Sequence, residues 1–151
     1  MQSDSKAGLS PAHGRDLRRI AGLMIPASAE FGVPAADDAA IFDDTLRSLG
    51  RDRDHVLTAL TQLGELAGGS FADLDETRQE AVAEAFLSSG TPAVATLGRV
   101  VLQCYYRDDR VVRSLGLEPR APFPKGHALE QGDWSLLDVV RSRPKMWRDA
   151  P

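Results

Sequence analysis

The sequence of 151 residues contains little cysteine and histidine, the side chains that most often build metal and redox centres. Its single cysteine, Cys104, excludes an internal disulfide, a four-cysteine zinc site and an iron–sulfur cluster ligated by this chain alone. Its three histidines, His13, His55 and His127, lie far apart, without the spacing of a histidine metal motif. We therefore expect no metal in this chain, and one free thiol is compatible with a reducing compartment.

Long apolar runs and dense basic runs are also missing. No segment reaches the roughly 18 apolar residues of a membrane-spanning helix, so no membrane span is expected. The net charge is −4, and the arginines near the C-terminus are interspersed with acidic and apolar residues. Because a nucleic-acid surface needs clustered Lys and Arg, we expect no nucleic-acid partner either.

The familiar catalytic patterns do not occur. The sequence has no glycine-rich phosphate loop and no GxSxG motif. Asp43 and Asp44 are neighbours in sequence only, since adjacent side chains on a helix point about 100° apart. Tyr105 and Tyr106 have no His or Lys in the same helix to support acid–base chemistry. We expect no catalytic residue and no cofactor-binding residue in this chain.

One feature near the N-terminus is similar to a twin-arginine export signal. Arg18 and Arg19 precede an apolar run, Ile20–Ile25, and the small residues that follow Pro26 are typical of a cleavage site. The run is shorter than the roughly 7 residues of an export signal, and its apolar side chains recur at helical spacing. We favour a first amphipathic helix and a cytoplasmic protein, with export to the periplasm as the alternative.

Glycine, proline and capping residues divide most of the chain into helices. After a loose polar segment over residues 1–14, helices are predicted at about 15–25, 35–49, 53–67, 73–88 and 91–105, with a short helical continuation after Asp109 that closes at Leu115. No stretch shows the alternation of apolar and polar residues that is typical of a β-strand. The predicted fold class is therefore all-α: a small bundle of five to six helices over residues 15–116. The side chains expected to face the core include Ile41, Phe42, Leu46, Leu49, Val56, Leu57, Leu60, Leu63, Ala67, Ala81, Val82, Ala85 and Phe86.

The helix over residues 91–105 is the most apolar one. Thr91 can cap its first free amides, and Pro92 loses no hydrogen bond at the first helical position. Its apolar residues cover too much of the circumference for a half-exposed helix. It is therefore either the central helix of the bundle or partly covered by another protein. These apolar residues are Val94, Leu97, Val100, Val101, Leu102, Cys104 and Tyr105.

Residues 117–151 form a different segment, which we call the arm. Pro119, Pro122 and Pro124 keep its beginning extended, and Asp133 can cap a short helix over 134–140. A helix this short needs its apolar side buried against something else. The arm either binds a protein partner or folds back on its own bundle. The expected partner contacts are Tyr105, Tyr106, Phe123, Trp134, Leu137 and Trp147, because interfaces are rich in aromatic anchors.

Several of these features together suggest a family. They are a first helix ending in Met24-Ile25-Pro26, Phe42, Phe71, the pair Tyr105-Tyr106 before an acidic turn, Leu115-Gly116-Leu117, Pro122-Phe123-Pro124 and Gly126. Over about residues 15–127 the chain resembles the gluconate 2-dehydrogenase subunit 3 family, the small subunits of sugar dehydrogenases. The resemblance implies a large FAD-dependent partner of the glucose-methanol-choline type, which holds the flavin and the catalytic histidine.

In such complexes the small subunit assists folding, stability or export of the large one, and a cytochrome or other acceptor takes the electrons in some of them. Members of the family often carry a twin-arginine signal ahead of the first helix, whereas here the arginine pair lies within that helix. The resulting hypothesis is a noncatalytic small subunit of a heteromeric oxidoreductase acting on a sugar or sugar-like alcohol. The alternative is a stand-alone helical regulatory or ligand-binding module whose tail packs on itself.

Overall fold

The computed structural model describes residues 9–121, 123, 125–126, 128–146 and 148. Within them the protein is all-α, as predicted, and its only β-type pairing is a single bridge between Ser28 and Val33. The chain divides into two units, Met1–Pro119 and Arg120–Pro151, which are described separately. The helices are α1 (Pro11–Met24), α2 (Ala39–Ser48), α3 (Arg53–Ala67), α4 (Glu76–Ser88), α5 (Pro92–Tyr105), α6 (Asp109–Ser114) and α7 (Asp138–Arg141), with short 3₁₀ turns η1 (Gly50–Asp52), η2 (Phe71–Asp73) and η3 (Trp134–Leu137).

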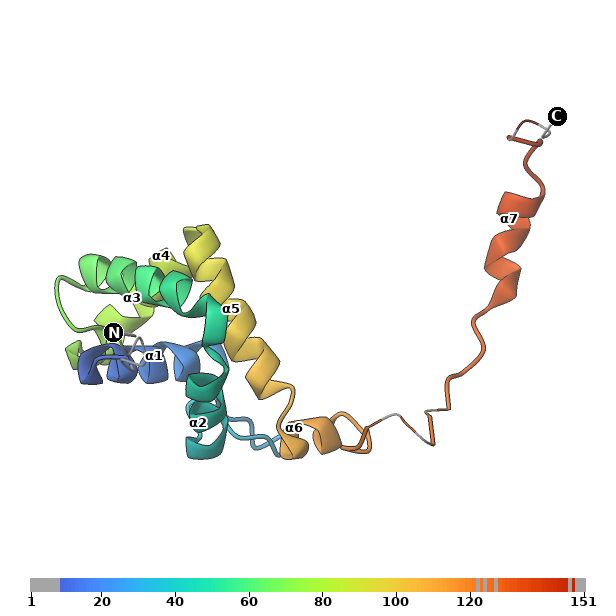
Figure 1. Cartoon of the computed structure of the whole chain (residues 1–151). Coiled ribbons are helices and arrows are strands. Elements are labelled where there is room, and N and C mark those ends of the chain that lie inside the picture. Colours follow the sequence, from blue (N-terminus) through green and yellow to red (C-terminus); the bar gives the residue numbers. More distant parts are fainter. Residues whose placement is uncertain (1–8, 122, 124, 127, 147, 149–151) are drawn as a thin grey trace, which may run out of the picture. The chain divides into compact units, whose positions relative to one another are not determined.

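The core of the first unit is centred on α3 and α5. Helix α5 packs against both α3 and α2, while α3 also contacts α4 and α1 (Figure 1). Leu60 and Leu63 of α3 and Leu97 of α5 are fully buried. Of the two positions considered for the most apolar helix, the structure shows the central one, although Leu102 lies on the exposed side of α5.

Several helix ends follow the signals in the sequence. The Thr91 hydroxyl accepts a hydrogen bond from the Val94 amide at 3.3 Å, and Pro92 begins α5. Helix α3 has the predicted bounds because Gly68, at φ +70°, ends it in the left-handed conformation that glycine adopts readily. The end of α3 and the start of α5 are thus correctly predicted.

Three predicted helix starts are wrong. The first helix begins at Pro11, because the Ser10 hydroxyl accepts from the His13 amide, so residues 11–14 are helical rather than loose. The second begins at Ala39, because the Asp38 carboxylate caps it through the Ala40 amide. The fourth is capped by Asp75 instead of Asp73, which lies in the turn η2.

The face that α4 turns to the core also differs from the prediction. Ala81 and Ala85 are exposed, and the buried side chains are Gln79, Ala83 and Phe86. Gln79 determines this orientation because its amide nitrogen donates to the backbone carbonyls of the preceding turn η2, at 3.3 Å to each of two oxygens. Smaller differences occur in two other helices, where Leu46 is exposed and Leu57 is half-buried.

A buried carboxylate holds η2 against α1. One oxygen of Asp16 accepts from the Ser70 hydroxyl at 2.8 Å and from the Ala72 amide at 2.9 Å. Across the same turn, Arg19 donates to Gln79 at 2.5 Å. Buried polar groups are costly unless they are hydrogen-bonded, so this network fixes the connection between α3 and α4 in place.

The second unit consists of an extended stretch followed by η3 and α7. The Asp133 carboxylate caps η3 through the Ser135 amide at 3.0 Å, as predicted. Neither η3 nor α7 contains a buried residue. Among the described residues of both units, no single helix has the length and apolar composition to cross a membrane; α4 and α5 pass that test only as a pair bent by 109°.

Candidate partner interface

Tyr105 and Tyr106 lie at the C-terminal end of α5 and occupy different environments. Their ring centroids are 5.3 Å apart, and the rings meet edge to face at 86°. Tyr105 is 4% exposed, and burial raises the pKa of its phenol, with smaller contributions from Tyr106 and Asp108. Tyr106 is largely exposed. The pair therefore presents one aromatic ring to the surface, supported by another beneath it.

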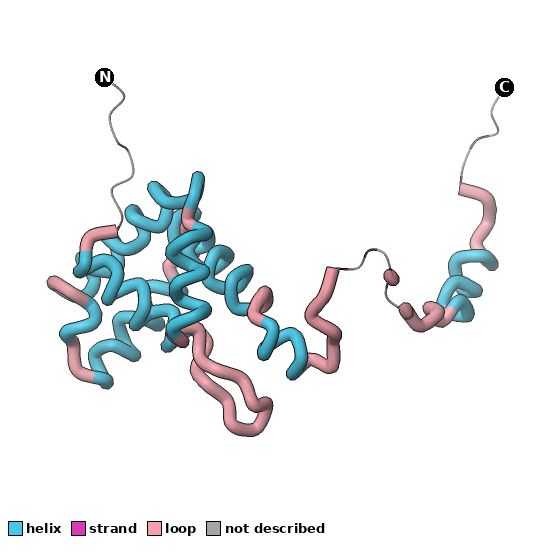
Figure 2. Tube along the Cα trace, turned by 60° about the horizontal axis from the view of Figure 1, so that its bottom comes forward, coloured by secondary structure: helices cyan, strands magenta, loops and turns pink. Residues whose placement is uncertain are grey.

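A short hairpin between α1 and α2 brings a third aromatic ring to this region. Ser28 and Val33 exchange backbone hydrogen bonds of 3.1 and 3.0 Å, and Gly32 turns the chain at φ +62°. The Phe31 amide donates to the Ser28 hydroxyl at 3.3 Å, which fixes the backbone that carries the phenyl ring. Figure 2 shows this segment within the long loop that projects from the helices. Phe31 is 67% exposed, so the hairpin holds an aromatic side chain out in solvent.

The hairpin and the α5–α6 corner together enclose an apolar groove of about 260 Å³. We call it the hairpin groove. It combines residues that are far apart in sequence, because the loop after α1 passes close to α6 (Figure 1). The residues that line it are Phe31, Val33, Tyr105, Tyr106, Val111, Ser114 and Leu115.

The end of α6 directs further apolar side chains to the surface. Gly116, at φ +74°, donates to the Arg113 carbonyl at 2.9 Å, and the Leu117 amide donates to the Val112 carbonyl at 3.3 Å. This pair of bonds is a Schellman motif, which fixes the direction in which the chain leaves the helix. Leu115 and Leu117 are both exposed beside it.

Ion pairs hold the elements that surround the groove. Arg110 of α6 donates to Asp38, the cap of α2, and to Asp108, the cap of α6 itself. The pKa values of Asp38 and Asp108 are lowered, mainly because both carboxylates accept hydrogen bonds from Arg110. The same bonds raise the pKa of Arg110. One guanidinium thus links the starts of two helices.

A second guanidinium joins α2 to the turn after α5. Arg107 donates to one Asp44 oxygen at 3.0 and 2.6 Å and to the Ser48 hydroxyl at 2.7 Å. The bond to Asp44 raises the pKa of Arg107. Cys104 is buried, with its sulfur 3.4 Å from the same guanidinium. Asp44 therefore has a structural partner, while Asp43 is exposed, as expected for two neighbours on a helix.

The predicted contacts of the arm lie in the second unit. Phe123 is 86% exposed, Trp134 is 61% exposed and Leu137 is 40% exposed, while Trp147 lies outside the described residues. The indole nitrogen of Trp134 donates to Gln131 at 2.9 Å, which restrains the ring. The described part of this unit leaves further large apolar side chains exposed, namely Leu129, Leu136, Val139, Val140 and Met146.

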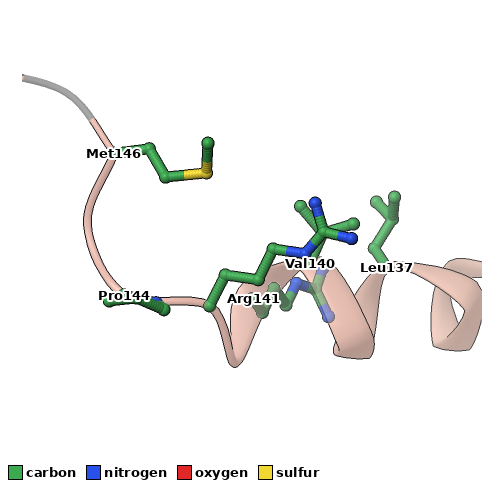
Figure 3. Close-up of a pocket in the computed structure, with 6 residues that line it drawn as sticks. Leu137, Val140, Arg141, Pro144 and Met146 are labelled. Carbon is green, nitrogen blue, oxygen red and sulfur yellow. The ribbon is translucent and has the colours of Figure 1, made fainter.

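An apolar hollow of about 450 Å³ lies where α7 ends. Figure 3 shows that the chain turns at Pro144 and that Met146 points back toward the side of the helix that carries Val140 and Leu137. Arg141 and Arg143 complete the lining. Its lining thus combines apolar side chains with two arginines, and apolar residues, Met and Arg are common in protein interfaces.

Only part of this surface is predictable from the sequence. Tyr105 and Tyr106 were predicted contacts, and the structure brings them together in the hairpin groove with Phe31 and Leu115, which were not predicted. In the second unit Phe123, Trp134 and Leu137 were predicted contacts, and Met146 was not. His55 is exposed, and no group of three His, Cys, Asp or Glu side chains in the described parts of the chain is placed to hold a metal ion.

Comparison with known proteins gives no relative. No family model, no curated protein and no solved structure matches this chain.

Proposed function

We propose that this chain is the noncatalytic small subunit of a heteromeric FAD-dependent oxidoreductase of the glucose-methanol-choline type. The observation that carries the proposal is the set of exposed apolar side chains in the second unit. Phe123, Trp134 and Met146 are each more than half exposed, and η3 and α7 bury no residue. Segments of this kind gain stability by burying such side chains against another surface, which a large partner subunit offers.

The polar groups of the first unit support a structural rather than a chemical role. Asp16 bonds to the η2 segment, Arg107 joins α2 to the end of α5, and Arg110 joins two helix caps. Burial keeps the Tyr105 phenol protonated by raising its pKa, which disfavours it as a base near neutral pH. Each of these polar groups stabilises the fold, and we assign the oxidation reaction to the partner subunit.

The kind of partner comes from the resemblance to the gluconate 2-dehydrogenase subunit 3 family. The large subunit holds FAD and acts on a sugar or sugar-like alcohol, and electrons pass to a cytochrome or another acceptor. The present chain assists the folding, stability and assembly of that subunit. We assign the complex to the cytoplasm, with the periplasm as the alternative for a complex exported as a unit.

Loss of the anchoring side chains tests this proposal. The tagged chain is purified from its native host, and the amount of co-purified large subunit is compared between the wild type and the double variant Trp134→Ala, Trp147→Ala. A buried aromatic anchor contributes on the order of 2 kcal/mol or more at an interface, so we expect affinity to fall at least about 25-fold. Undiminished co-purification of the double variant contradicts the proposal.

A matched control removes apolar side chains of similar exposure elsewhere. Leu66 in α3 and Leu102 in α5 are exposed and do not line the hairpin groove. The double variant Leu66→Ala, Leu102→Ala is expected to retain the partner. If the wild-type chain purifies alone and colourless, and its C-terminus resists proteolysis, the stand-alone module with a self-packed tail is favoured instead.

A further inference from the structure

The apolar hollow at the end of α7 lies in a positively charged stretch of the chain. Between positions 139 and 148 the sequence has four basic residues and no acidic one, although the net charge of the whole chain is −4. Two of the four, Arg141 and Arg143, line the hollow. The rest of the lining is apolar: Leu137, Val140, Pro144 and Met146 (Figure 3). The hollow therefore offers an apolar surface next to a concentration of positive charge.

The two arginines differ in their acidic partners. Arg141 donates to Asp138 at 3.1 Å, so α7 itself supplies this guanidinium with a carboxylate. Arg143 is exposed and makes no ion pair with any described residue. A segment that fills the hollow removes part of the water around Arg143, and a cation that loses water without gaining a negative partner costs free energy. An occupant without negative charge is therefore disfavoured.

The apolar side chains of the lining indicate the other half of the occupant. Leu137 and Val140 lie on one side of the helix, and Met146 points back toward them. Such a surface packs against an apolar side chain, and methionine adapts readily to its shape. The lining has no aromatic ring on which a nucleic-acid base could stack. A protein segment that carries an apolar side chain beside Asp or Glu matches both the apolar and the cationic part of the lining.

We propose that the hollow at the end of α7 receives an acidic segment of the large flavin subunit, in which an apolar side chain is flanked by Asp or Glu. The apolar side chain packs against Val140 and Met146, and a neighbouring carboxylate accepts hydrogen bonds from Arg143. This inference rests on the proposed function and deepens it, because it names the chemistry of the partner's surface. Opposite charges also speed the encounter of two proteins, and salt screens this attraction.

Salt and single substitutions separate the charged from the apolar half of this contact. The FAD-containing subunit is isolated from the complex, and its affinity for full-length variants is measured at about 0.05 M and about 0.5 M NaCl. We expect Arg143→Glu to weaken binding at least about tenfold at the lower salt concentration, because it replaces attraction by repulsion, and by a smaller factor at the higher one. Met146→Ala should weaken binding about three- to tenfold at both concentrations, because salt does not screen apolar contacts.

Arg78 of α4 supplies the matched control. It is exposed, as Arg143 is, and it also makes no ion pair with a described residue. Arg78→Glu changes the net charge of the chain by the same amount but lies in the first unit. We expect this variant to bind as the wild type does. The thermal midpoint of each free chain is recorded, and that of Arg143→Glu should equal the wild-type value because its side chain is exposed.

The other outcomes overturn the inference in distinguishable ways. If Arg143→Glu binds normally at the lower salt concentration while the double variant Trp134→Ala, Trp147→Ala binds weakly, the partner does not use the hollow, and the proposed function stands. If Arg143→Glu binds the subunit normally but loses the wild-type binding to vesicles of phosphatidylglycerol, the positive stretch serves an anionic membrane surface instead. If the wild-type chain binds no flavin subunit, the proposed function fails, and the acidic contact fails with it.

Discussion

Arg110 binds Asp38 across 72 residues of sequence, with one guanidinium nitrogen 2.7 Å and another 3.2 Å from the two carboxylate oxygens. Asp38 caps α2, and Arg110 also binds Asp108, which caps α6. The α1–α2 loop that carries Phe31 ends at this cap, and α6 forms the opposite wall of the hairpin groove. The pair therefore couples the two walls of the groove electrostatically.

The Arg110–Asp38 pair is expected to make the stability of the folded chain depend on pH. Because Arg110 lowers the folded-state pKa of both Asp38 and Asp108 from 3.8, the stabilisation is fully present above pH 3.8 and is lost as pH falls through the folded-state pKa values. The variant Arg110→Gln should therefore be less stable than the wild type by up to about 1 kcal/mol near pH 7, since the side chains are partly exposed. Near pH 2 the difference should be smaller.

Urea unfolding at both pH values measures this difference. The control is Arg113→Gln, because Arg113 pairs with Asp109 and both side chains are mostly exposed. That substitution should change stability little at either pH. An Arg110→Gln effect of equal size at pH 7 and pH 2 shows that the pair does not act through the Asp38 charge.

The central packing of α5 predicts a strong contrast between two leucines on one helix. Leu97 is fully buried and Leu102 is exposed. Leu97→Ala is expected to lower the free energy of unfolding by about 2–5 kcal/mol, because it removes buried methylenes and leaves a cavity. Leu102→Ala should change it by less than about 0.5 kcal/mol. Chemical denaturation of the free chain measures both, and similar losses would mean that α5 packs through a different face.

The buried carboxylate of Asp16 should contribute more to stability than an exposed one. Asp16→Ala removes the acceptor for the Ser70 hydroxyl and the Ala72 amide, so both donors lose their bond. We expect a loss of about 1–3 kcal/mol, and almost none for Asp43→Ala, whose side chain is exposed. Urea unfolding compares the two variants, and equal stabilities refute the role given to Asp16.

The first unit is expected to fold without the second. All buried residues of the described structure lie between Asp16 and Val111, so a chain ending at Pro119 retains the whole core. Its thermal midpoint should match that of the full chain within about 2 °C. A fall of more than about 4 °C, the shift that roughly 1 kcal/mol causes in a domain of this size, shows that residues after 119 stabilise the bundle.

The sequence was most informative where structure is decided locally. The end of α3 follows from Gly68, the start of α5 from Thr91 and Pro92, and the cap of η3 from Asp133. These signals depend on a few adjacent residues, and apolar periodicity is sufficient to place most of the core. The all-α class follows from them directly.

The start of α4 and the role of Phe31 were missed because distant contacts decide them. Asp73 and Asp75 are both plausible caps for α4, and the choice depends on Gln79, which bonds back to η2 and to Arg19 of α1. Phe31 gave no periodic signal, because a hairpin this short has neither a helical nor a strand repeat. A serine, a glycine and an aromatic residue in one short loop were the only sign of it.

We propose that this chain binds a larger flavin-containing subunit. The most direct measurement is the visible absorption spectrum of the complex purified through the tagged full-length chain, with the chain ending at Pro119 as control. We expect a yellow complex with a second, larger polypeptide that releases FAD on denaturation, and much less of this complex with the shorter chain. A colourless preparation of the full-length chain alone would contradict it.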